Sequence, residues 1–296
     1  MRNFIFGTDW GEDCDDVVAM RILARKHKAG EIKLLGIAIN TCIDESVASL
    51  DAFLVSEGVE QLPIGVDRGA TELCKKITYQ KRLAASGKAR ITNADAEGGV
   101  KLYRRILAEA IEPVEIIEVG FLQILAGLLE SEADEYSPLG GVELVRTKVA
   151  KIWSMAGKFD EDGGREYNIY KSELTRKAAA TVVEKCPVPI TFLGFEVGAP
   201  VITGGDSVLK EGDVLLDAMR DYGNGHGRNS WDPMTALLAV IGDEEKAGYD
   251  VVRGTVSVDV ESGASYFTRS ENGSHAYVVK KHDDTYYSNM INEIIA

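Results

Sequence analysis

Positive charge is in short supply in this 296-residue chain, which has 33 Lys and Arg against 47 Asp and Glu and a formal net charge of −14. Because no basic excess is present to neutralise phosphates, we expect neither a nucleic acid nor an anionic membrane surface as partner. The sequence also lacks a run of about twenty apolar residues, which a membrane-spanning helix requires. No secretory signal follows Met1, so we expect a cytoplasmic protein whose partner is a small molecule.

Cysteine is scarce as well, and its spacing is uninformative. The four cysteines are Cys14, Cys42, Cys74 and Cys186. None of them forms a C-x-x-C pair, so the pattern is typical of reduced thiols and excludes a disulfide framework or a cysteine-ligated zinc site.

The most informative stretch is an acidic turn near the start of the chain. Apolar Phe4–Phe6 predict the end of a buried strand, and Val17–Leu23 open a helical pattern. Between them lie four aspartates within eight residues: Asp9, Asp13, Asp15 and Asp16. Carboxylates this close repel, so at least one is expected to be protonated or to bind a cation. With oxygen ligands and no nearby His or Cys, a hard ion such as Ca²⁺ or Mg²⁺ is favoured; helix capping would explain Asp13 or Asp15 without a metal, but not all four.

The rest of the chain alternates between strand and helix patterns. Strands are predicted at 32–39, 63–66, 114–119, 148–155 and 189–193, and helices at 17–28, 46–57, 98–110, 122–129, 172–184, from 232 onward and at 284–295. We therefore expect an α/β fold with an open, mostly parallel sheet and helices on both faces. After Tyr249 alternating residues at 255–260 and 276–279 suggest added antiparallel strands. Residues 67–98 read as a polar excursion or lid, and 222–230 as a mobile glycine-rich loop. With no linker and no repeat, residues 1–296 are expected to form a single domain.

Polar residues recur where the predicted strands end. They are Asp9, Asn40, the main chain near Val119, Met155, Glu166, Asn168 and Asp232. In a parallel sheet such positions converge on one edge, which makes them a candidate site. Carboxylates and carboxamides are also the groups needed to hold several sugar hydroxyls.

Three of these segments resemble motifs of the inosine-uridine nucleoside hydrolase family. Thr8-Asp-Trp-Gly-Glu-Asp-Cys-Asp-Asp16 is similar to the amino-terminal Asp-rich motif, Glu166-Tyr-Asn-Ile169 to an A-E-F-N-I segment, and Ser230-Trp-Asp-Pro233 to a late H-D-P motif. The resemblance covers the chain from residue 4 to about 240, and it implies the Rossmann-like nucleoside hydrolase fold. It also implies hydrolysis of the N-glycosidic bond of ribonucleosides, and a homodimer or homotetramer.

The resemblance further implies roles for individual residues. Ca²⁺ would be held by Asp9, Asp16, Asp232 and the main-chain carbonyl of Val119, with Asp9 as general base. The ribose would be surrounded by Asp15, Asn40, Met155, Glu166, Asn168 and Asp232.

Departures from the family pattern concern the substrate. Trp231 stands where one branch of the family has a His that protonates the leaving base; the purine-preferring branch carries Trp there, so a purine is favoured, although Trp231 could instead pack at the helix start. His226, in the glycine-rich loop, is a weak candidate for the leaving-group acid, and a solvated loop histidine is the simpler interpretation. Gly163-Gly164 stand where many members contact the 5′-hydroxyl, so recognition of that hydroxyl stays open.

Two other functions are kept as alternatives. One is a catalytically impaired riboside-binding protein, because the leaving-group acid is missing. The other is an Asp-dependent phosphatase, in which a second Asp would follow the nucleophile by two residues; Gly11 stands at that position after Asp9. Arg228 could contact a phosphate, but a single Arg is weak support.

Overall fold

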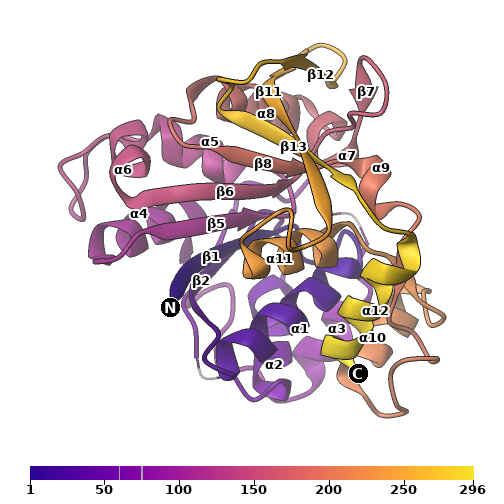
Figure 1. The fold of residues 1–296 in the computed structure, drawn as a ribbon. Coiled ribbons are helices and arrows are strands. Elements are labelled where there is room, and N and C mark those ends of the chain that lie inside the picture. Colours follow the sequence, from indigo (N-terminus) through magenta and orange to yellow (C-terminus); the bar gives the residue numbers. More distant parts are fainter. Residues whose placement is uncertain (60, 75) are drawn as a thin grey trace.

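A computed structural model describes residues 1–59, 61–74 and 76–296. Lys75, part of the predicted 67–98 excursion, lies outside the described residues. Within the described chain an 11-stranded sheet has the order β4-β3-β2-β1-β5-β6-β8-β13-β11-β12-β7 (Figure 1). Its strands are β1 Arg2–Thr8, β2 Ile32–Ile39, β3 Ile64–Val66, β4 Glu97–Gly98, β5 Val114–Glu118, β6 Val149–Met155, β7 Gly164–Arg165, β8 Ile190–Leu193, β11 Tyr249–Val258, β12 Ala264–Arg269 and β13 His275–Lys280. A separate two-stranded pair joins β9 Ile202–Thr203 to β10 Arg228–Asn229.

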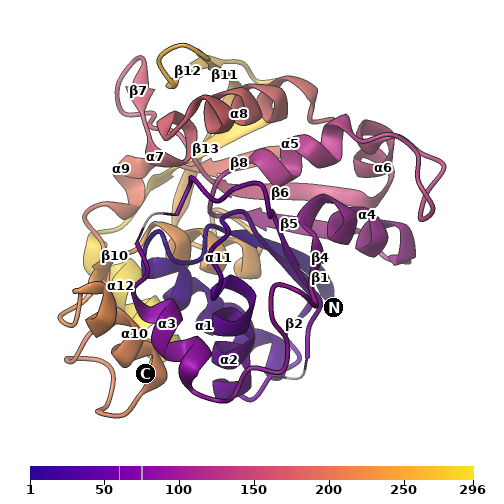
Figure 2. The ribbon, with the colours of Figure 1, turned by 180° about the vertical axis from the view of Figure 1, so that it is seen from behind.

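Helices cover both faces of this sheet (Figures 1 and 2). One face packs against α1 Asp15–Lys28, α2 Ser46–Ser56, α3 Tyr79–Ala85, α10 Val214–Tyr222, α11 Trp231–Ile241 and α12 Asp284–Ile295. The other packs against α4 Gly99–Glu109, α5 Gln123–Glu130, α6 Gly141–Lys148 and α8 Glu173–Lys185. The short helices α7 Tyr167–Tyr170 and α9 Phe195–Gly198 follow strands near the carboxyl edge of the sheet.

Strand β1 shows why the sheet must be covered twice. Successive side chains of a strand point to opposite faces, and in β1 Phe4 and Phe6 join one buried cluster while Ile5 joins the other. All three side chains are fully buried. A continuous apolar run therefore places this strand at the centre of a parallel sheet.

The predicted fold class is confirmed, with one correction to the strand directions. All neighbours from β4 to β13 run parallel, and β11, β12 and β7 extend the sheet in antiparallel pairs. The predicted strand at 276–279 is β13, and it runs parallel to β8 rather than belonging only to the antiparallel extension. Alternation along one strand does not encode the direction of its neighbour, so the sequence could not decide this.

Several elements were not predicted. Helix α6 opens at Gly141 and buries few side chains, which weakens its periodic signal. Helix α10 carries a recognisable signal, because the Asp213 side chain accepts a hydrogen bond from Leu215 N–H as an N-cap. The 67–98 segment contains α3 and β4, and the 222–230 segment contains β10 paired with β9. Closure of 67–98 over a ligand stays a prediction.

The chain order places the reversal of the sheet between β1 and β5. From β1 the chain builds outward to β4, then returns to β5 on the other side of β1. In open α/β sheets, ligands bind at such a reversal, outside the carboxyl ends of the strands. Across the part of the chain that the structure describes, no helix combines the length and apolar character needed to cross a membrane.

Candidate active site and metal centre

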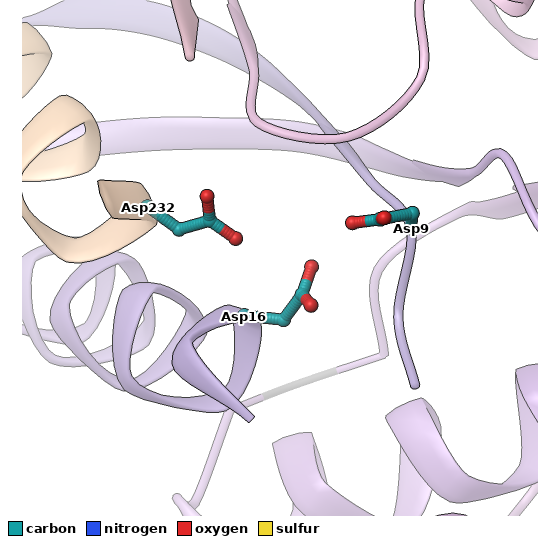
Figure 3. A group of neighbouring side chains, drawn as sticks. All are labelled: Asp9, Asp16 and Asp232. Atoms are coloured by element: carbon teal, nitrogen blue, oxygen red, sulfur yellow. The ribbon is translucent and has the colours of Figure 1, made fainter. Parts of the chain in front are cut away.

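Three aspartates from distant segments meet at this edge of the sheet. Asp9 follows β1, Asp16 lies in the first turn of α1 and Asp232 in the first turn of α11. One carboxylate oxygen of each lies within 4.8 Å of the others, and Figure 3 shows the three side chains pointing toward one another. Two helix N-termini, which carry partial positive charge, thus deliver carboxylates to one point.

The surroundings of this triad hold it in place and leave an oxygen free. Thr8 Oγ1 donates a hydrogen bond to Asp16 Oδ1, whereas the buried Asp16 Oδ2 has no hydrogen-bond partner among the described residues. The backbone N–H of Asp232 donates to Asp15 Oδ2 at 3.1 Å, which ties the start of α11 to the start of α1. A buried carboxylate oxygen left unpaired is costly, so it points to an ion or another group that completes the site.

Burial and mutual repulsion both act on these carboxyls. Loss of hydration raises the pKa of Asp9, Asp15, Asp16 and Asp232 well above the usual range, and the charges of neighbouring carboxylates raise each pKa further. A bound divalent cation would compensate both the lost hydration and the mutual repulsion of the carboxylates. Hard carboxylate oxygens without His or Cys fit Ca²⁺ or Mg²⁺. The donor set therefore fits a hard metal ion.

The triad opens onto a cavity of about 460 Å³, within the usual size range for small-molecule sites. Its wall consists of Asp9, Glu12, Asp13, Asp15, Lys76, Val119, Met155, Glu166, Tyr167, Asn168, Tyr170, Lys171, Phe195, Tyr222, Arg228, Trp231 and Asp232. Nine of the ten predicted metal and substrate residues are thus brought together, eight as lining residues and Asp16 as the third member of the triad.

Asn168 fixes the loops that follow β5 and β6. Its Nδ2 donates to the carbonyls of Val119 and Met155 at 2.8 and 3.0 Å. Because a carbonyl oxygen has two lone pairs, the bond from Asn168 leaves Val119 O able to bind a cation as well.

Glu166 lies next to Asn168 and is nearly buried. It accepts hydrogen bonds from the backbone N–H groups of Asn168 and Gly157. Burial raises the pKa of Glu166 to about 7, although the bonds from these backbone groups lower it. This carboxyl is poised to exchange a proton near neutral pH.

Asn40 is the predicted substrate residue that does not line the cavity. It is fully buried; its Oδ1 accepts from Phe121 N–H at 3.2 Å, and its main-chain oxygen accepts from Gln123 Nε2. A side chain at Gly120 would place its Cβ 2.6 Å from Asn40 Oδ1 and 2.4 Å from Asp9 N, so only glycine permits this close approach. In this structure Asn40 supports the turn after β5.

Trp231, the candidate for contact with the base, and His226, the candidate for the leaving-group acid, lie in different surroundings. Trp231 lines the cavity, stacks on Phe195 with ring centroids 5.3 Å apart, and donates its Nε1–H to the Phe195 carbonyl. His226 is 95% exposed, pairs with Asp206, and is not a lining residue. The loop position of His226 alone could not show which way its ring points.

Polar contacts missed by sequence reasoning surround the cavity mouth. Glu12 Oε2 accepts from Tyr167 OH and from Lys171 Nζ at 2.8 and 2.7 Å, while Tyr222 OH donates to the main-chain oxygen of Glu12. Arg228 forms a two-pronged salt bridge with Asp13. These partners are up to 215 positions apart, and no local motif links them.

The shape of the whole chain matches solved structures, although its sequence is distant. No protein-family profile and no curated protein matches the chain. An inosine-uridine preferring nucleoside hydrolase from Bacillus anthracis is similar with a TM-score of 0.73 and 17% identity, covering 99% of both chains. A purine-preferring ribonucleoside hydrolase from Gardnerella vaginalis is similar with a TM-score of 0.74 and 15% identity, covering 99% of this chain and 98% of its own.

A third similar structure is the type III effector XopQ in complex with adenosine diphosphate ribose, with a TM-score of 0.71 and 13% identity over 99% of this chain and 93% of the effector. At such identities the likeness concerns the fold. The resemblance seen in three short motifs is thereby confirmed over the full chain in three dimensions: this protein has the nucleoside hydrolase fold.

Proposed function

We propose that this protein hydrolyses the N-glycosidic bond of ribonucleosides to free base and ribose, with Ca²⁺ as cofactor and a preference for purines. The observation that carries the proposal is the buried triad of Asp9, Asp16 and Asp232, whose carboxylate oxygens lie within 4.8 Å of one another beside a cavity lined by Asp9 and Asp232. The nucleoside hydrolase fold of the two enzymes named above supports it.

The chain's own residues account for the chemistry as follows. Asp9 belongs both to the triad and to the cavity wall, so it is placed to accept a proton from the attacking water. The carboxylates that line the cavity stabilise the positive charge that develops on the ribose ring as the bond breaks. A divalent cation held by Asp9, Asp16, Asp232 and the Val119 carbonyl would supply charge that orients the ribose diol and lowers the pKa of a water molecule.

The proposed purine preference depends on the aromatic wall of the cavity. Trp231 and Phe195 stack on each other there, and a flat apolar surface favours a large heterocycle over a small one. The bond from Trp231 Nε1–H to the Phe195 carbonyl shows that the indole also packs. Comparing inosine, adenosine, guanosine and uridine as substrates measures this preference directly.

A riboside-binding protein without turnover is the second candidate. The effector XopQ is similar in fold and was solved with adenosine diphosphate ribose, and the present site lacks a histidine at the cavity wall among the described residues. A phosphatase is disfavoured by Gly11, which follows Asp9 by two residues. The homodimer or homotetramer, the cytoplasmic location and the single-domain organisation stay predictions.

The deciding experiment measures release of base and reducing sugar from the four nucleosides with Ca²⁺, with Mg²⁺ and with a chelator. We expect cleavage that requires the metal, and a 10²- to 10⁴-fold loss of kcat in Asp9→Asn, the range typical for removal of a general base. Asp51→Asn serves as control, because Asp51 is buried but pairs with Arg90 away from the cavity. Nucleoside binding by calorimetry without any release of sugar would support the binding protein instead.

A further inference from the structure

The wall beside Trp231 has few free hydrogen-bond donors. Trp231 donates its indole Nε1–H to the Phe195 carbonyl at 2.8 Å, and the Tyr222 hydroxyl donates to the main-chain oxygen of Glu12 at 2.9 Å. The side chain of His226 is 95% exposed, pairs with Asp206 and does not line the cavity. On this wall the departing base can therefore not receive a proton from an imidazole or an indole.

Arg228 lies on the same wall and still has donors to offer. Its Nε donates to Asp13 Oδ1 at 2.9 Å, its Nη2 donates to Asp13 Oδ2, and its Nη1 donates to Asn229 Oδ1 at 3.2 Å. A guanidinium has five N–H groups, so these bonds leave one hydrogen on each terminal nitrogen for a ligand.

The guanidinium is also well fixed and close to the aromatic surface. Its central carbon lies 5.2 Å from the centre of the Trp231 ring and 5.9 Å from that of Tyr222. The two-pronged bond to Asp13 sets the plane of the group, and β10 anchors its backbone against β9. A cation held rigidly in a partly water-excluded wall is suited to stabilising developing negative charge.

We propose that Arg228 is the catalytic residue that stabilises the leaving base, by donating hydrogen bonds to its heteroatoms as the C1′–N bond breaks. This inference rests on the proposed function. The electron pair of the C1′–N bond moves onto the base, the water oxygen bonds to C1′, and the water proton goes to Asp9. After release the base takes a proton from solvent and Asp9 returns its proton to solvent, so the sum is nucleoside plus water giving base plus ribose.

The electrostatics of Arg228 agree with hydrogen bonding rather than proton transfer. Partial burial lowers the pKa of its guanidinium, but the bonds and the charge of Asp13 outweigh burial and raise that pKa above its ordinary value. Arg228 thus stays protonated at neutral pH. It acts as a donor throughout the reaction and is not consumed.

The test compares two leaving groups in Arg228→Met and Arg228→Lys. Inosine releases a base that needs stabilisation, whereas p-nitrophenyl β-D-ribofuranoside releases nitrophenolate, which is a stable anion without help. We expect Arg228→Met to lower kcat for inosine about 10²-fold, as removal of one transition-state donor does elsewhere, and to change kcat for the nitrophenyl riboside less than about 5-fold. Lys lacks the forked donor geometry, so Arg228→Lys should fall between Met and the native enzyme.

Arg220→Met is the matched control, since Arg220 pairs with Glu211 at the surface and is not a lining residue; both rates should stay native. An equal loss on both substrates, or no loss on inosine, would overturn the role of Arg228. Thermal melting of each variant separates these results from misfolding. Absence of turnover of both substrates by the native protein would instead refute the proposed function, and the role of Arg228 with it.

Discussion

Asp16→Asn should change the thermal stability of the protein in opposite directions with and without metal. At 4.8 Å and an effective dielectric constant of about 20, two carboxylates repel by about 3 kcal/mol, and Asp16 faces both Asp9 and Asp232. Because their raised pKa values mean that part of this charge is neutralised by protons, the gain from removing one charge is smaller, about 1 to 3 kcal/mol. Asparagine keeps an oxygen for the hydroxyl of Thr8.

With metal present the native protein should gain more than the variant. A cation at about 100 times its dissociation constant stabilises the folded state by about 2.7 kcal/mol, which corresponds to about 5 °C in Tm for a chain of this size. Asp16→Asn removes a ligand with an unpaired oxygen, so this shift should largely disappear. In a chelator the variant should melt higher than the native protein, and in Ca²⁺ it should melt lower.

Differential scanning calorimetry at pH 7.5 measures Tm of the native protein and of Asp16→Asn in a chelator, in excess Ca²⁺ and in excess Mg²⁺. The larger shift identifies the better-fitting cation. Asp51→Asn should lower Tm in both media and keep the native metal shift, because its partner is Arg90. A variant that melts below the native protein in chelator, or a native Tm that no divalent cation changes, would refute the electrostatic account of the triad.

Two further perturbations probe the frame around the site. Burial raises the pKa of Glu118 to about 8, although the hydrogen bond from Tyr103 lowers it. The neutral carboxyl therefore contributes stability that is complete below about pH 4 and is lost as pH rises through about 8. The free energy of unfolding of Glu118→Gln should therefore rise relative to that of the native protein as pH increases from 5 to 8, by about 3 kcal/mol near pH 7. Parallel curves of Tm against pH for the two proteins would contradict this. Asn168→Ala leaves the buried carbonyls of Val119 and Met155 without their donor, so urea unfolding should show a loss of about 2 to 5 kcal/mol; a loss below about 0.5 kcal/mol would show that these bonds are dispensable.

The helices and strands that position the site could be predicted from local sequence patterns. The apolar run of β1, the acidic start of α1 and the Pro233 in the first turn of α11 each have a short-range physical cause, so their positions could be predicted within a few residues. A mostly parallel sheet also followed, because alternating strands and helices favour it and place ligands at its carboxyl edge; the order of the strands came only from the structure. Three spaced motifs then indicated the fold that the solved nucleoside hydrolases share.

Other features depended on contacts between segments far apart in the chain. Nothing near Asn40 shows that its side chain supports the turn at Gly120 instead of facing the cavity. The direction of β13 depends on its pairing with β8, and His226 pairs with Asp206, which is 20 positions away in the chain. Long-range pairing has no local code, so pattern reasoning leaves such choices open.

By itself, the sequence determined which residues could bind a hard cation and which strand ends would deliver them, because charge density and hydrophobic periodicity are properties of short segments. The grouping of Asp232 with Asp9 and Asp16 came from the family resemblance, whereas only the tertiary structure gave the distances between their carboxylates and decided that Arg228 pairs with Asp13 across 215 positions. The physical reason is that a salt bridge or a shared cation depends on distances in space, which the packing of α1 against α11 sets.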